Sequence, residues 1–521
     1  MKDRIGWFKE HFSDCFDQEG ALDLFKIGTL LESNVLGSAP EEYQFSWVGK
    51  SYAKALASSP VTTVLSENTE HNSKAENKDS QNILIKGDNL EGLKHLLSKF
   101  SEQVGMIYID PPYNTGKNNF VYQDSRSFKE AELTKLLQCS KTEARERLRS
   151  ISKDSNAHSA WLTFIYPRLF LAQKLLRKDG VIFISIDDNE EAQLRLVCNE
   201  IFGEQNFISR IVWHNNRKGR QQDAHIKGTN EAILVYAKDV TQVQFAMEKR
   251  ACKIKHLQQD SISQFEKGYP LHNGTADFHI NNRPTLAYSI YYHPETTEAL
   301  TIDEKVHQAD EWCIGQATRP DLLEQGYLRI IPKYNAKYAN QRVWRWSQAK
   351  FLREYKTELL FLIQKDGTPY FYGKNRLPEH NTKFVRFKNY IAVDSGRGKI
   401  DLKDLEIPNY FEKPKPLDLI VQLLEMLPVN EDMIVLDFFA GSGTTAQAVM
   451  RQNAIDGGMR RWILVQIEEE IARGKPAFKA GFRTISELTK HRIGLGAEQI
   501  RDSFPDCHGD LGFRYFGLKS K

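Results

Sequence analysis

Two short motifs in this 521-residue chain hold residue types whose spacing could support chemistry on a small planar nitrogen group. The first motif is Asp110, Pro111, Pro112 and Tyr113, which directly follows the apolar run VGMIYI. Two successive prolines restrict the backbone to a rigid, extended turn. On such a turn the Asp110 carboxylate and the Pro111 carbonyl can accept two N–H bonds from an exocyclic amine of a purine or pyrimidine, while Tyr113 stacks on the ring. The alternative is a structural Pro-Pro turn with Asp110 as its cap.

The second motif is the glycine-rich sequence LDFFAGSGTTA at 436–446, where a strand runs into a turn that opens a helix. Gly441 and Gly443 would let the backbone approach a ligand closely. The motif also fits the loose G-x-G-x-x-A pattern of dinucleotide-binding proteins. Glu468 ends the next apolar run and is placed to bind ribose hydroxyls, although its spacing from Gly441 is loose for that pattern. The alternatives are a tight turn without a ligand and a surface acid at a strand end.

The elements that must position these motifs are short β-type runs that alternate with helical patterns. Apolar runs occur at 83–85, 104–109, 181–186, 433–438 and 463–467, and segments with apolar residues at helical spacing lie between several of them. This alternation predicts an α/β fold with parallel strands in a twisted sheet. Ligands of such sheets bind at the carboxyl ends of the strands, which is where both motifs lie.

The pattern changes between about 240 and 405, where aromatic-rich segments alternate with basic loops. This change predicts a separate domain at 241–405 that is inserted into the α/β fold. Residues 58–82 are rich in polar residues and have no apolar period, which predicts a linker. The other expected parts are an N-terminal segment at 1–57, the two halves of the α/β domain at 83–240 and 406–480, and a C-terminal segment at 481–521.

A basic segment with interleaved aromatic residues lies inside the expected inserted domain. Residues 331–356 contain seven Lys or Arg residues and a single acid, Glu354, together with tyrosines and tryptophans. Cations bind phosphates and aromatic rings can stack on bases, so the segment predicts a nucleic-acid contact. The alternative is a solvated basic face over a small core that includes the tryptophans. The residues selected as nucleic-acid ligands are Arg342 and Arg345 here, and Arg217, Lys218 and Arg220 in the basic loop NNRKGR.

Composition excludes several classes of protein. The chain has 71 Lys and Arg against 68 Asp and Glu, 40% hydrophobic residues and 27% charged residues, which is typical of a soluble globular protein and not of a disordered or collagen-like chain. No apolar run is long enough to span a membrane, and the charged N-terminus lacks the apolar core of a secretory signal. The cysteines and histidines have no metal-ligand spacing, so we expect no metal and a cytoplasmic location.

Taken together, the sequences DPPY and FAGSG resemble the amino-methyltransferases that use S-adenosylmethionine and act on DNA. The catalytic motif precedes the glycine-rich motif, which resembles the permuted order called the beta class. The segments EEYQFSWVGK, ILIKGDNLEGLKHLL, WLTFIYPRLFLAQKLLRKDGVIFISIDDNE, EIFGEQNFI, GTNEAILVYAKD, FEKPKPLDLI and GFRYFGL further resemble the modification subunits of Type III restriction-modification systems.

This resemblance implies a Rossmann-like class I methyltransferase sheet, circularly permuted, with an inserted DNA target-recognition domain at 241–405. It also assigns roles by motif. Asp110, Pro111, Pro112 and Tyr113 match the catalytic tetrad of the family. The residues matched to the cofactor are Phe439, Gly441 and Gly443 around the methionine part, Asp437 beside that loop, Glu468 at the ribose, Asp88 at the adenine, and Lys415 in a motif that flanks the cofactor.

The implied activity is transfer of a methyl group from S-adenosylmethionine to N6 of a flipped-out adenine in double-stranded DNA. Asp rather than Ser before Pro-Pro-Tyr favours adenine over cytosine N4 by analogy with the family. The implied partners are double-stranded DNA, a second copy in a homodimer and a restriction subunit with helicase and nuclease activity. The alternatives are a cytosine-N4 methyltransferase, a dinucleotide-dependent oxidoreductase and a non-catalytic DNA-binding subunit.

Overall fold

The chain divides into two compact units. The first comprises Met1–Ala246 and Lys388–Lys521, and the second comprises Met247–Phe387. The computed structural model describes residues 45–114, 157–219, 225–251, 257–308, 311–336, 340–376, 382–429 and 433–521.

The first unit is built on a large mixed sheet of ten strands in the order β1-β23-β2-β22-β21-β3-β4-β6-β5-β20. The run from β23 to β4 is parallel, and β6 reverses direction between β4 and β5. The strands are β1 (Thr63–Glu67), β2 (Ile83–Lys86), β3 (Val104–Ile109), β4 (Leu176–Ile186), β5 (Phe207–His214), β6 (Asn230–Ala237), β20 (Tyr390–Ala392), β21 (Ile434–Asp437), β22 (Arg461–Gln466) and β23 (Arg514–Ser520).

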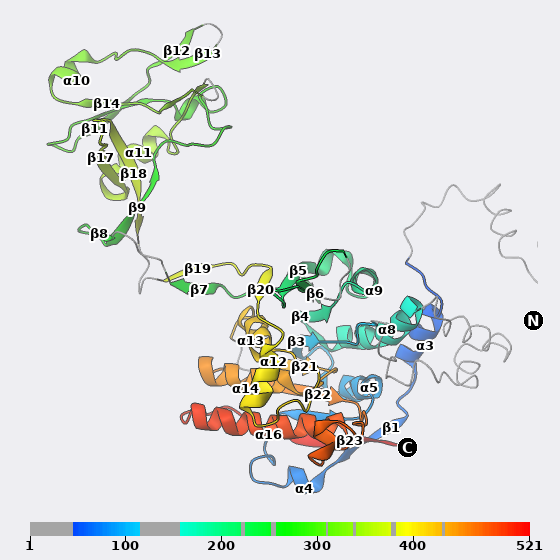
Figure 1. Cartoon of the computed structure of the whole chain (residues 1–521). Helices are drawn as coiled ribbons and strands as arrows, with labels where there is room; N and C mark the ends of the chain where they lie inside the picture. Colours follow the sequence, from blue (N-terminus) through cyan, green and yellow to red (C-terminus); the bar gives the residue numbers. More distant parts are fainter. Residues whose placement is uncertain are drawn as a thin grey trace, which may run out of the picture. The chain divides into compact units, whose positions relative to one another are not determined.

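Helices cover both faces of this sheet, which explains why its central strands are continuous apolar runs. All six residues of β3 and all four residues of β21 are buried. Figure 1 shows α13, α14 and α16 on one face and α5, α8 and α3 on the other. The helices of this unit are α3 (Lys50–Ser58), α4 (Thr69–Asn72), α5 (Asn89–Phe100), α8 (Ala157–Leu175), α9 (Glu191–Phe202), α12 (Arg397–Asp404), α13 (Leu417–Glu425), α14 (Thr444–Asp456), α15 (Pro476–Lys479) and α16 (Ile485–Ser503).

The connections on the two sides of the sheet centre run in opposite directions. The chain leaves β3 through residues 110–156 and α8 and returns as the neighbouring β4. It leaves β21 through α14 and returns as β22 on the other side. Because β3 and β21 are themselves neighbours, the loops at their carboxyl ends diverge and leave a crevice at this switch point. Both sequence motifs follow these two strands.

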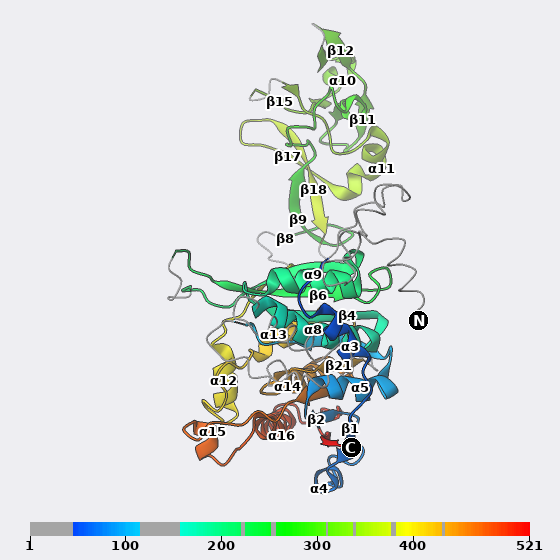
Figure 2. The same cartoon turned by 90° about the vertical axis from the view of Figure 1, so that its right-hand side faces the viewer.

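Residues 58–82 are not the linker that the sequence predicts. They contain β1 and α4, and β1 pairs antiparallel with β23 at the edge of the sheet (Figure 2). Their polar residues are used internally: the Asn72 side chain donates to the Tyr515 carbonyl at 3.2 Å and accepts from the Tyr515 amide at 2.7 Å. Asn82 likewise donates to the Gly512 carbonyl at 3.0 Å. Polar composition here reflects buried asparagines that bind backbone, which composition alone does not distinguish from a solvated loop.

The second unit is a mainly β structure with several small sheets. Its largest sheet has four strands in the order β17-β18-β9-β8. The strands of this unit are β7 (Glu248–Ala251), β8 (Leu257–Gln259), β9 (Gln264–Pro270), β10 (Ser289–Tyr292), β11 (Ala299–Ile302), β12 (Lys305–Gln308), β13 (Glu311–Ile314), β14 (Leu328–Ile330), β15 (Tyr334–Asn335), β16 (Asn340–Gln341), β17 (Leu359–Ile363), β18 (Pro369–Arg376) and β19 (Thr382–Val385), and the helices are α10 (Pro320–Glu324) and α11 (Gln348–Glu358).

The second unit is shorter than the domain predicted at 241–405. Residues 388–405 belong to the first unit, because β20 extends the main sheet in parallel with β5 and α12 packs near α13. The Asp401 carboxylate on α12 also accepts the backbone amide of Leu417 at 2.8 Å, at the start of α13. Aromatic and basic residues therefore continue in the sequence beyond residue 388, where the chain has already returned to the first unit.

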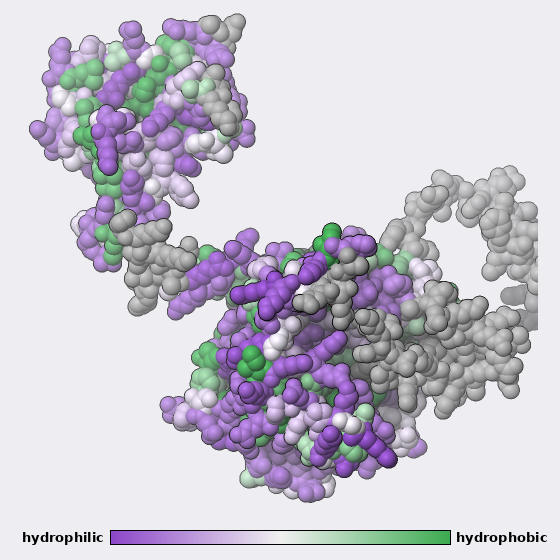
Figure 3. Space-filling model, in the orientation of Figure 1, coloured by the Kyte–Doolittle hydropathy of each residue, from purple (hydrophilic) through white to green (hydrophobic). Residues whose placement is uncertain are grey.

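In the view of Figure 3 the surface of the first unit is mostly hydrophilic, with small scattered apolar patches. Within the described residues, no helix is both long and apolar enough to cross a membrane. The same part of the chain contains no group of three or more His, Cys, Asp or Glu residues arranged to hold a metal ion.

Candidate active site

A cavity of about 210 Å³ opens at the carboxyl ends of β3, β21 and β22. It brings together six residues that the sequence selects from distant segments: Asp110, Pro112, Lys415, Asp437, Phe439 and Gly441. Further lining comes from Tyr108, Phe411, Lys413, Ala440, Ser442, Thr444, Thr445, Gln466, Glu469 and Ile485.

The Asp110 carboxylate is held in place by two donors. Its Oδ1 accepts from Lys415 Nζ at 2.6 Å and from the Tyr113 hydroxyl at 2.7 Å. Lys415 Nζ also donates to the Tyr113 oxygen at 2.9 Å and lies 5.0 Å from the centre of the Tyr113 ring. The three side chains form a closed triangle in which the carboxylate keeps one orientation.

Tyr113 is a neutral donor in this triangle. Burial raises the pKa of its phenol well above 10, and the charges of Asp110 and Glu231 raise it further. Glu231, at the start of β6, offers its Oε2 as a second acceptor 3.2 Å from the Tyr113 hydroxyl. Because β6 is antiparallel to β4, its first residues lie at the same edge of the sheet as Asp110. The sequence reasoning assigned no role to Glu231, although it lies in the segment GTNEAILVYAKD that resembles the family.

The backbone of the Pro-Pro turn is fixed from behind. The buried Trp161 on α8 donates its indole N–H to the Pro112 carbonyl at 2.7 Å. Asn114 has a φ of 55°, a conformation that non-glycine residues rarely adopt. Its side chain donates to Oε1 of the fully buried Glu190 at 2.6 Å, and His158 Nδ1 lies 2.9 Å from the same oxygen. Burial raises the pKa of Glu190. Sequence patterns gave no indication of this support.

The glycine-rich turn depends on conformations that glycine adopts without strain. Gly441 has a φ of 53° and Gly443 a φ of 85°, and Gly443 is the N-cap residue that precedes α14. The Gly441 amide donates to Gln466 Oε1 at 2.7 Å, and its carbonyl accepts from Thr489 Oγ1 at 2.6 Å. A Cβ on Gly443 would lie 3.2 Å from the Thr489 methyl group. The loop is therefore locked between β22 and α16.

A buried arginine lies beneath this turn. Arg492 on α16 has no exposed surface and donates to Ser442 Oγ at 2.5 Å and Thr444 Oγ1 at 2.6 Å. Its Nη2 also donates to Gln447 Oε1 at 3.0 Å. Burial lowers the pKa of Arg492 to about 10, a value at which the guanidinium remains charged near neutral pH. The charge of Asp401 offsets part of this effect, while the hydrogen-bond partners of Arg492 in these contacts are neutral, so its guanidinium polarises the hydroxyl groups of Ser442 and Thr444.

Asp437 is a buried acid at the floor of the cavity. Its Oδ1 accepts the Phe439 amide at 2.9 Å and its Oδ2 accepts the Thr445 hydroxyl at 2.6 Å. Burial raises the pKa of Asp437 to about 7, and the charge of Asp110 contributes in the same direction. The carboxyl therefore titrates near neutral pH.

Three predicted cofactor residues, Gly443, Glu468 and Asp88, are not among the residues that line the cavity. Glu468 is about half exposed and forms a 2.7 Å ion pair with Lys86, whereas its neighbour Glu469 faces the cavity. Burial raises the pKa of Glu469, and the charge of Glu412 adds to this effect. Asp88 caps α5 by accepting the Glu91 amide at 3.0 Å. Of the two successive acids after β22, Glu469 therefore lines the cavity and Glu468 pairs with Lys86 outside it.

The predicted nucleic-acid ligands are divided among different environments. Arg342 is only 2% exposed, and its Nη1 donates to the Thr275 and Ala276 carbonyls, so the prediction that it contacts DNA is wrong in this structure. Its guanidinium instead satisfies backbone carbonyl groups in the interior of the second unit. Trp344, in the same segment, is also core. Arg345 is exposed, with its guanidinium 5.7 Å from the ring of Tyr269.

The basic loop after β5 lies in the first unit. Arg217 and Lys218 are exposed there, and the Lys218 amide donates to the side chain of Asn216 at 3.0 Å. Arg220 lies outside the described residues.

Comparison with known proteins gives matches over most of the chain. Residues 104–475 match the profile of a family described as DNA methylase. The chain is 38% identical over 498 residues to the Type III restriction-modification enzyme EcoPI Mod subunit of Escherichia phage P1, covering 94% of this chain and 73% of that protein. It is 35% identical to the EcoP15I Mod subunit of Escherichia coli, covering 96% and 76%. The solved PvuII DNA methyltransferase (cytosine-N4-specific) is 12% identical, covering 82% of this chain and 95% of that chain, with a TM-score of 0.32.

Proposed function

Because the chain belongs to the N6/N4 DNA methylase family, and within it to the Type III restriction-modification Mod subunits, we propose that it methylates N6 of adenine in double-stranded DNA. One observation supports the assignment of the site more than any other. Asp110 of the Pro-Pro-Tyr motif and Gly441 of the glycine-rich turn, which come from distant parts of the chain, line one cavity. An oxidoreductase would leave this pairing unexplained.

S-adenosylmethionine is the cofactor of this methyltransferase, and the chemistry of the cavity fits it. The carboxyl groups of Asp110, Asp437 and Glu469 line the cavity and can accept hydrogen bonds from the ammonium group of a cofactor whose methionine part also carries a sulfonium. The glycine-rich turn and the Phe439 ring would hold that methionine part. When bound, the cofactor supplies an electrophilic methyl group.

Two assignments at the cofactor remain proposals. We assign the ribose hydroxyls to the acids after β22, with Glu469 better placed than Glu468 because it faces the cavity. Asp88 remains the proposed contact to the cofactor adenine. Its carboxylate already caps α5 and accepts from Arg168 at 3.2 Å, so any further contact must be compatible with those two bonds.

The chain's own contribution to the reaction is to orient and activate the target amine. Lys415 and Tyr113 fix Oδ1 of Asp110, so the other carboxylate oxygen can accept an N–H of the amine while the Pro111 carbonyl accepts its second N–H. The lone pair of the amine held in this way then points towards the methyl donor. The amine becomes acidic as it acquires the methyl group, so Asp110 can take its proton without being a strong base.

The target base must leave the DNA stack to reach this site. Base extrusion costs a few kcal/mol, which stacking on an aromatic ring and hydrogen bonds to the base edge offset. Tyr113 is the proposed stacking partner. Its hydroxyl lies between the carboxylates of Asp110 and Glu231, and Lys415 Nζ lies 5.0 Å from the centre of its ring.

We also propose a fold type and a set of binding partners for the chain. The sheet order, with the catalytic motif earlier in the chain than the glycine-rich motif, supports a permuted Rossmann-like methyltransferase. The second unit is the proposed target-recognition domain. Membership of the Mod subunits implies DNA and a restriction (Res) subunit as partners. A homodimer and a cytoplasmic location are further predictions, and light scattering of the purified protein tests the first.

The experiment that tests the proposed function is methylation sequencing of DNA from a methylation-deficient host that expresses this chain alone. N6-methyladenine at one short motif is the expected result, and it would establish the activity, the base and the site together. N4-methylcytosine would keep the mechanism and overturn the choice of base. Unmodified DNA, from protein that binds S-adenosylmethionine, would favour the non-catalytic alternative or a requirement for another subunit.

A further inference from the structure

The largest sheet of the second unit has two chemically different faces. On one face Phe361 and Phe371 pack against Tyr292, with ring centres 4.4 and 5.2 Å away. Phe351 of α11 packs edge-on against Phe371 at 5.4 Å. This face belongs to the hydrophobic core, and α11 covers it.

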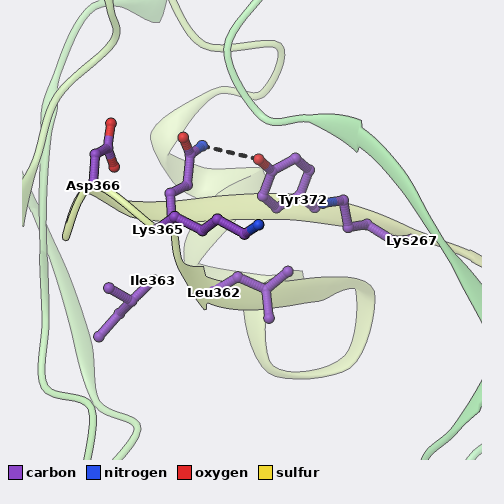
Figure 4. A pocket seen from close by; sticks show the side chains of 7 residues that line it. Lys267, Leu362, Ile363, Lys365, Asp366 and Tyr372 are labelled. Atoms are coloured by element: carbon purple, nitrogen blue, oxygen red, sulfur yellow. Dashed lines mark hydrogen bonds between the residues drawn. The ribbon is translucent and has the colours of Figure 1, made fainter.

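The other face carries the alternate residues of the same strands. Tyr370 and Tyr372 on β18 lie side by side here, with ring centres 5.7 Å apart. Figure 4 shows a hollow beside Tyr372, and its volume is about 480 Å³. The hollow is lined by Lys267, Leu362, Ile363, Gln364, Lys365, Asp366 and Tyr372.

Two lysines lie over these tyrosines, and a third lines the hollow beside them. Lys267 Nζ on β9 lies 4.1 Å from the centre of the Tyr372 ring, and Lys333 Nζ lies 4.9 Å from that of Tyr370. Lys365 is exposed at the rim of the hollow. Asp366 is the one acid among the residues that line it. We call the group formed by Lys267, Lys333, Lys365, Tyr370 and Tyr372 the lysine–tyrosine face.

Positive charges also act on the buried end of the lysine–tyrosine face, at His272 beside Tyr370. His272 Nδ1 lies 2.5 Å from the Tyr370 hydroxyl, and the pKa of His272 is lowered to about 4. Burial is the largest cause, and the charges of Lys333, Arg345 and Arg342 add to it. Three cations from the basic segment at 331–356 therefore act on the imidazole of His272, which lies beside the tyrosines.

The turn that presents Lys365 is well ordered by hydrogen bonds. The Gln364 amide donates to the Thr368 carbonyl at 2.8 Å, and the Gly367 amide donates back to the Gln364 carbonyl at 2.9 Å. The Gln364 side chain is anchored by its hydrogen bond to the Tyr372 hydroxyl at 3.0 Å. A cation on such a turn loses less conformational entropy on binding than one on a free loop.

We propose that the lysine–tyrosine face is the surface through which the second unit contacts DNA. Its three lysines match a polyanion, and phosphate contacts supply most of the affinity and fix the position of a protein on a duplex. Lysines held over aromatic rings are already partly oriented, and the hollow leaves room for a backbone strand. The proposal rests on DNA being the substrate of the chain, and it adds which surface binds it.

The basic segment at 331–356 supplies an internal comparison. Lys333 belongs to the lysine–tyrosine face, whereas Lys350, Arg353 and Lys356 belong to α11. Since α11 packs on the opposite face of the sheet through Phe351 and Tyr355, its exposed cations lie on the other side of the unit. The two groups have equal charge, so a general electrostatic attraction would not distinguish them.

The test compares two triple variants of the full-length protein. The first carries Lys267→Gln, Lys333→Gln and Lys365→Gln, and the second carries Lys350→Gln, Arg353→Gln and Lys356→Gln. Binding to a fluorescein-labelled duplex of mixed sequence is measured by anisotropy over a series of salt concentrations. We expect the slope of log K against log salt to become shallower by about 0.9 for each lost phosphate contact in the first variant only. The single variant Lys365→Gln, on an exposed turn, repeats the measurement with minimal risk to folding.

The outcomes distinguish a failure of the proposed DNA-binding surface from a failure of the proposed function. Unchanged slopes in the first triple variant and in Lys365→Gln, with wild-type protein that binds and methylates DNA, would overturn the proposed surface alone. A loss of slope only in the α11 variant would place the DNA on the opposite side of the unit. Normal DNA binding with loss of a bound restriction subunit would make the face a protein interface. Wild-type protein that neither binds nor methylates DNA would overturn the proposed function itself.

Discussion

Lys415 Nζ lies 2.6 Å from Oδ1 of Asp110, although 305 positions separate the two residues in the chain. The lysine comes from the loop before α13, and the aspartate comes from the end of β3. The pair therefore joins the two halves of the first unit at the site of the proposed chemistry. It also holds the proposed catalytic carboxylate in one orientation before the DNA base arrives.

Replacing Asp110 with Ala should abolish methylation while leaving cofactor binding mostly intact. The carboxylate is the proposed acceptor of the amine N–H, whereas the glycine-rich turn holds the cofactor. Single-turnover methylation and calorimetry with S-adenosylmethionine measure the two effects separately. Asp179→Ala is a matched control, because that residue pairs with Arg177 at the surface. Full activity in Asp110→Ala would eliminate the mechanism.

Replacing Lys415 with Met should reduce the rate of methyl transfer by about a hundredfold, the usual effect of removing one electrostatic contact from a catalytic group. Asp110 and Tyr113 would lose a shared donor, and the carboxylate would become free to rotate. Single-turnover kinetics report this step directly. Lys403→Met, on the exposed side of α12, should behave as wild type. A change confined to DNA affinity would show that Lys415 binds DNA and does not orient Asp110.

Replacing Gly441 with Val should weaken cofactor binding. The residue has a φ of 53°, where a β-branched side chain is strained by about 1–3 kcal/mol, and the turn must shift to relieve this strain. Gly457→Val is the control: its φ is 71°, but nothing lies within 4 Å of its added Cβ. It should lower the melting temperature without changing cofactor affinity. Equal cofactor affinities in Gly441→Val and wild type, measured by calorimetry, would remove the turn from the site.

Replacing Arg492 with Met should weaken binding of S-adenosylhomocysteine much more than binding of 5′-methylthioadenosine, which lacks the amino-acid part. The guanidinium polarises the hydroxyl groups of Ser442 and Thr444, two residues that line the cavity, and so favours a carboxylate there. Arg492→Lys should recover part of the difference, because it restores the charge. Equal losses for the two ligands would show that Arg492 only supports the turn.

The pH dependence of stability should carry the signature of Asp437. Burial raises the pKa of this acid from 3.8 to about 7, so the folded protein holds a proton there that the unfolded chain has released. The stabilising contribution is complete below about pH 4 and is lost as the pH rises through about 7. Each pKa unit corresponds to about 1.36 kcal/mol.

Asp437→Asn removes this titration while it keeps an uncharged acceptor for the Phe439 amide. We therefore expect the unfolding free energy of the variant to gain on wild type as the pH rises from about 5 to about 8, by up to a few kcal/mol. Urea denaturation across this range provides the measurement. A constant difference between the two proteins would show that Asp437 is already ionised when the protein is folded.

Residues that belong to local motifs could be located from the sequence, and residues that act through distant contacts could not. Asp110 and Gly441 are each marked by a rigid or permissive backbone at a strand end, and the structure brings them to one cavity. Glu231, Glu190 and Arg492 have no such local marker. Their roles come from strand antiparallelism and helix packing, which bring them to the site from other parts of the chain.

Burial was the other property that the sequence did not show. Arg342 and Arg345 belong to the same basic segment, but the first caps carbonyls in a core and the second is exposed. Spacing cannot separate them, because the short strands of this unit have no regular period. Similarly, buried asparagines gave residues 58–82 the composition of a linker.

The position of β21 and β22 between β2 and β3 has a consequence for synthesis on the ribosome. The strands β2 and β3 emerge early, but their neighbours on this side emerge only after the whole second unit has been translated. Until then the nascent chain presents open strand edges, which are prone to pair with other chains. Methylation competence is therefore acquired late, and a chaperone that shields these edges would raise the yield of active protein.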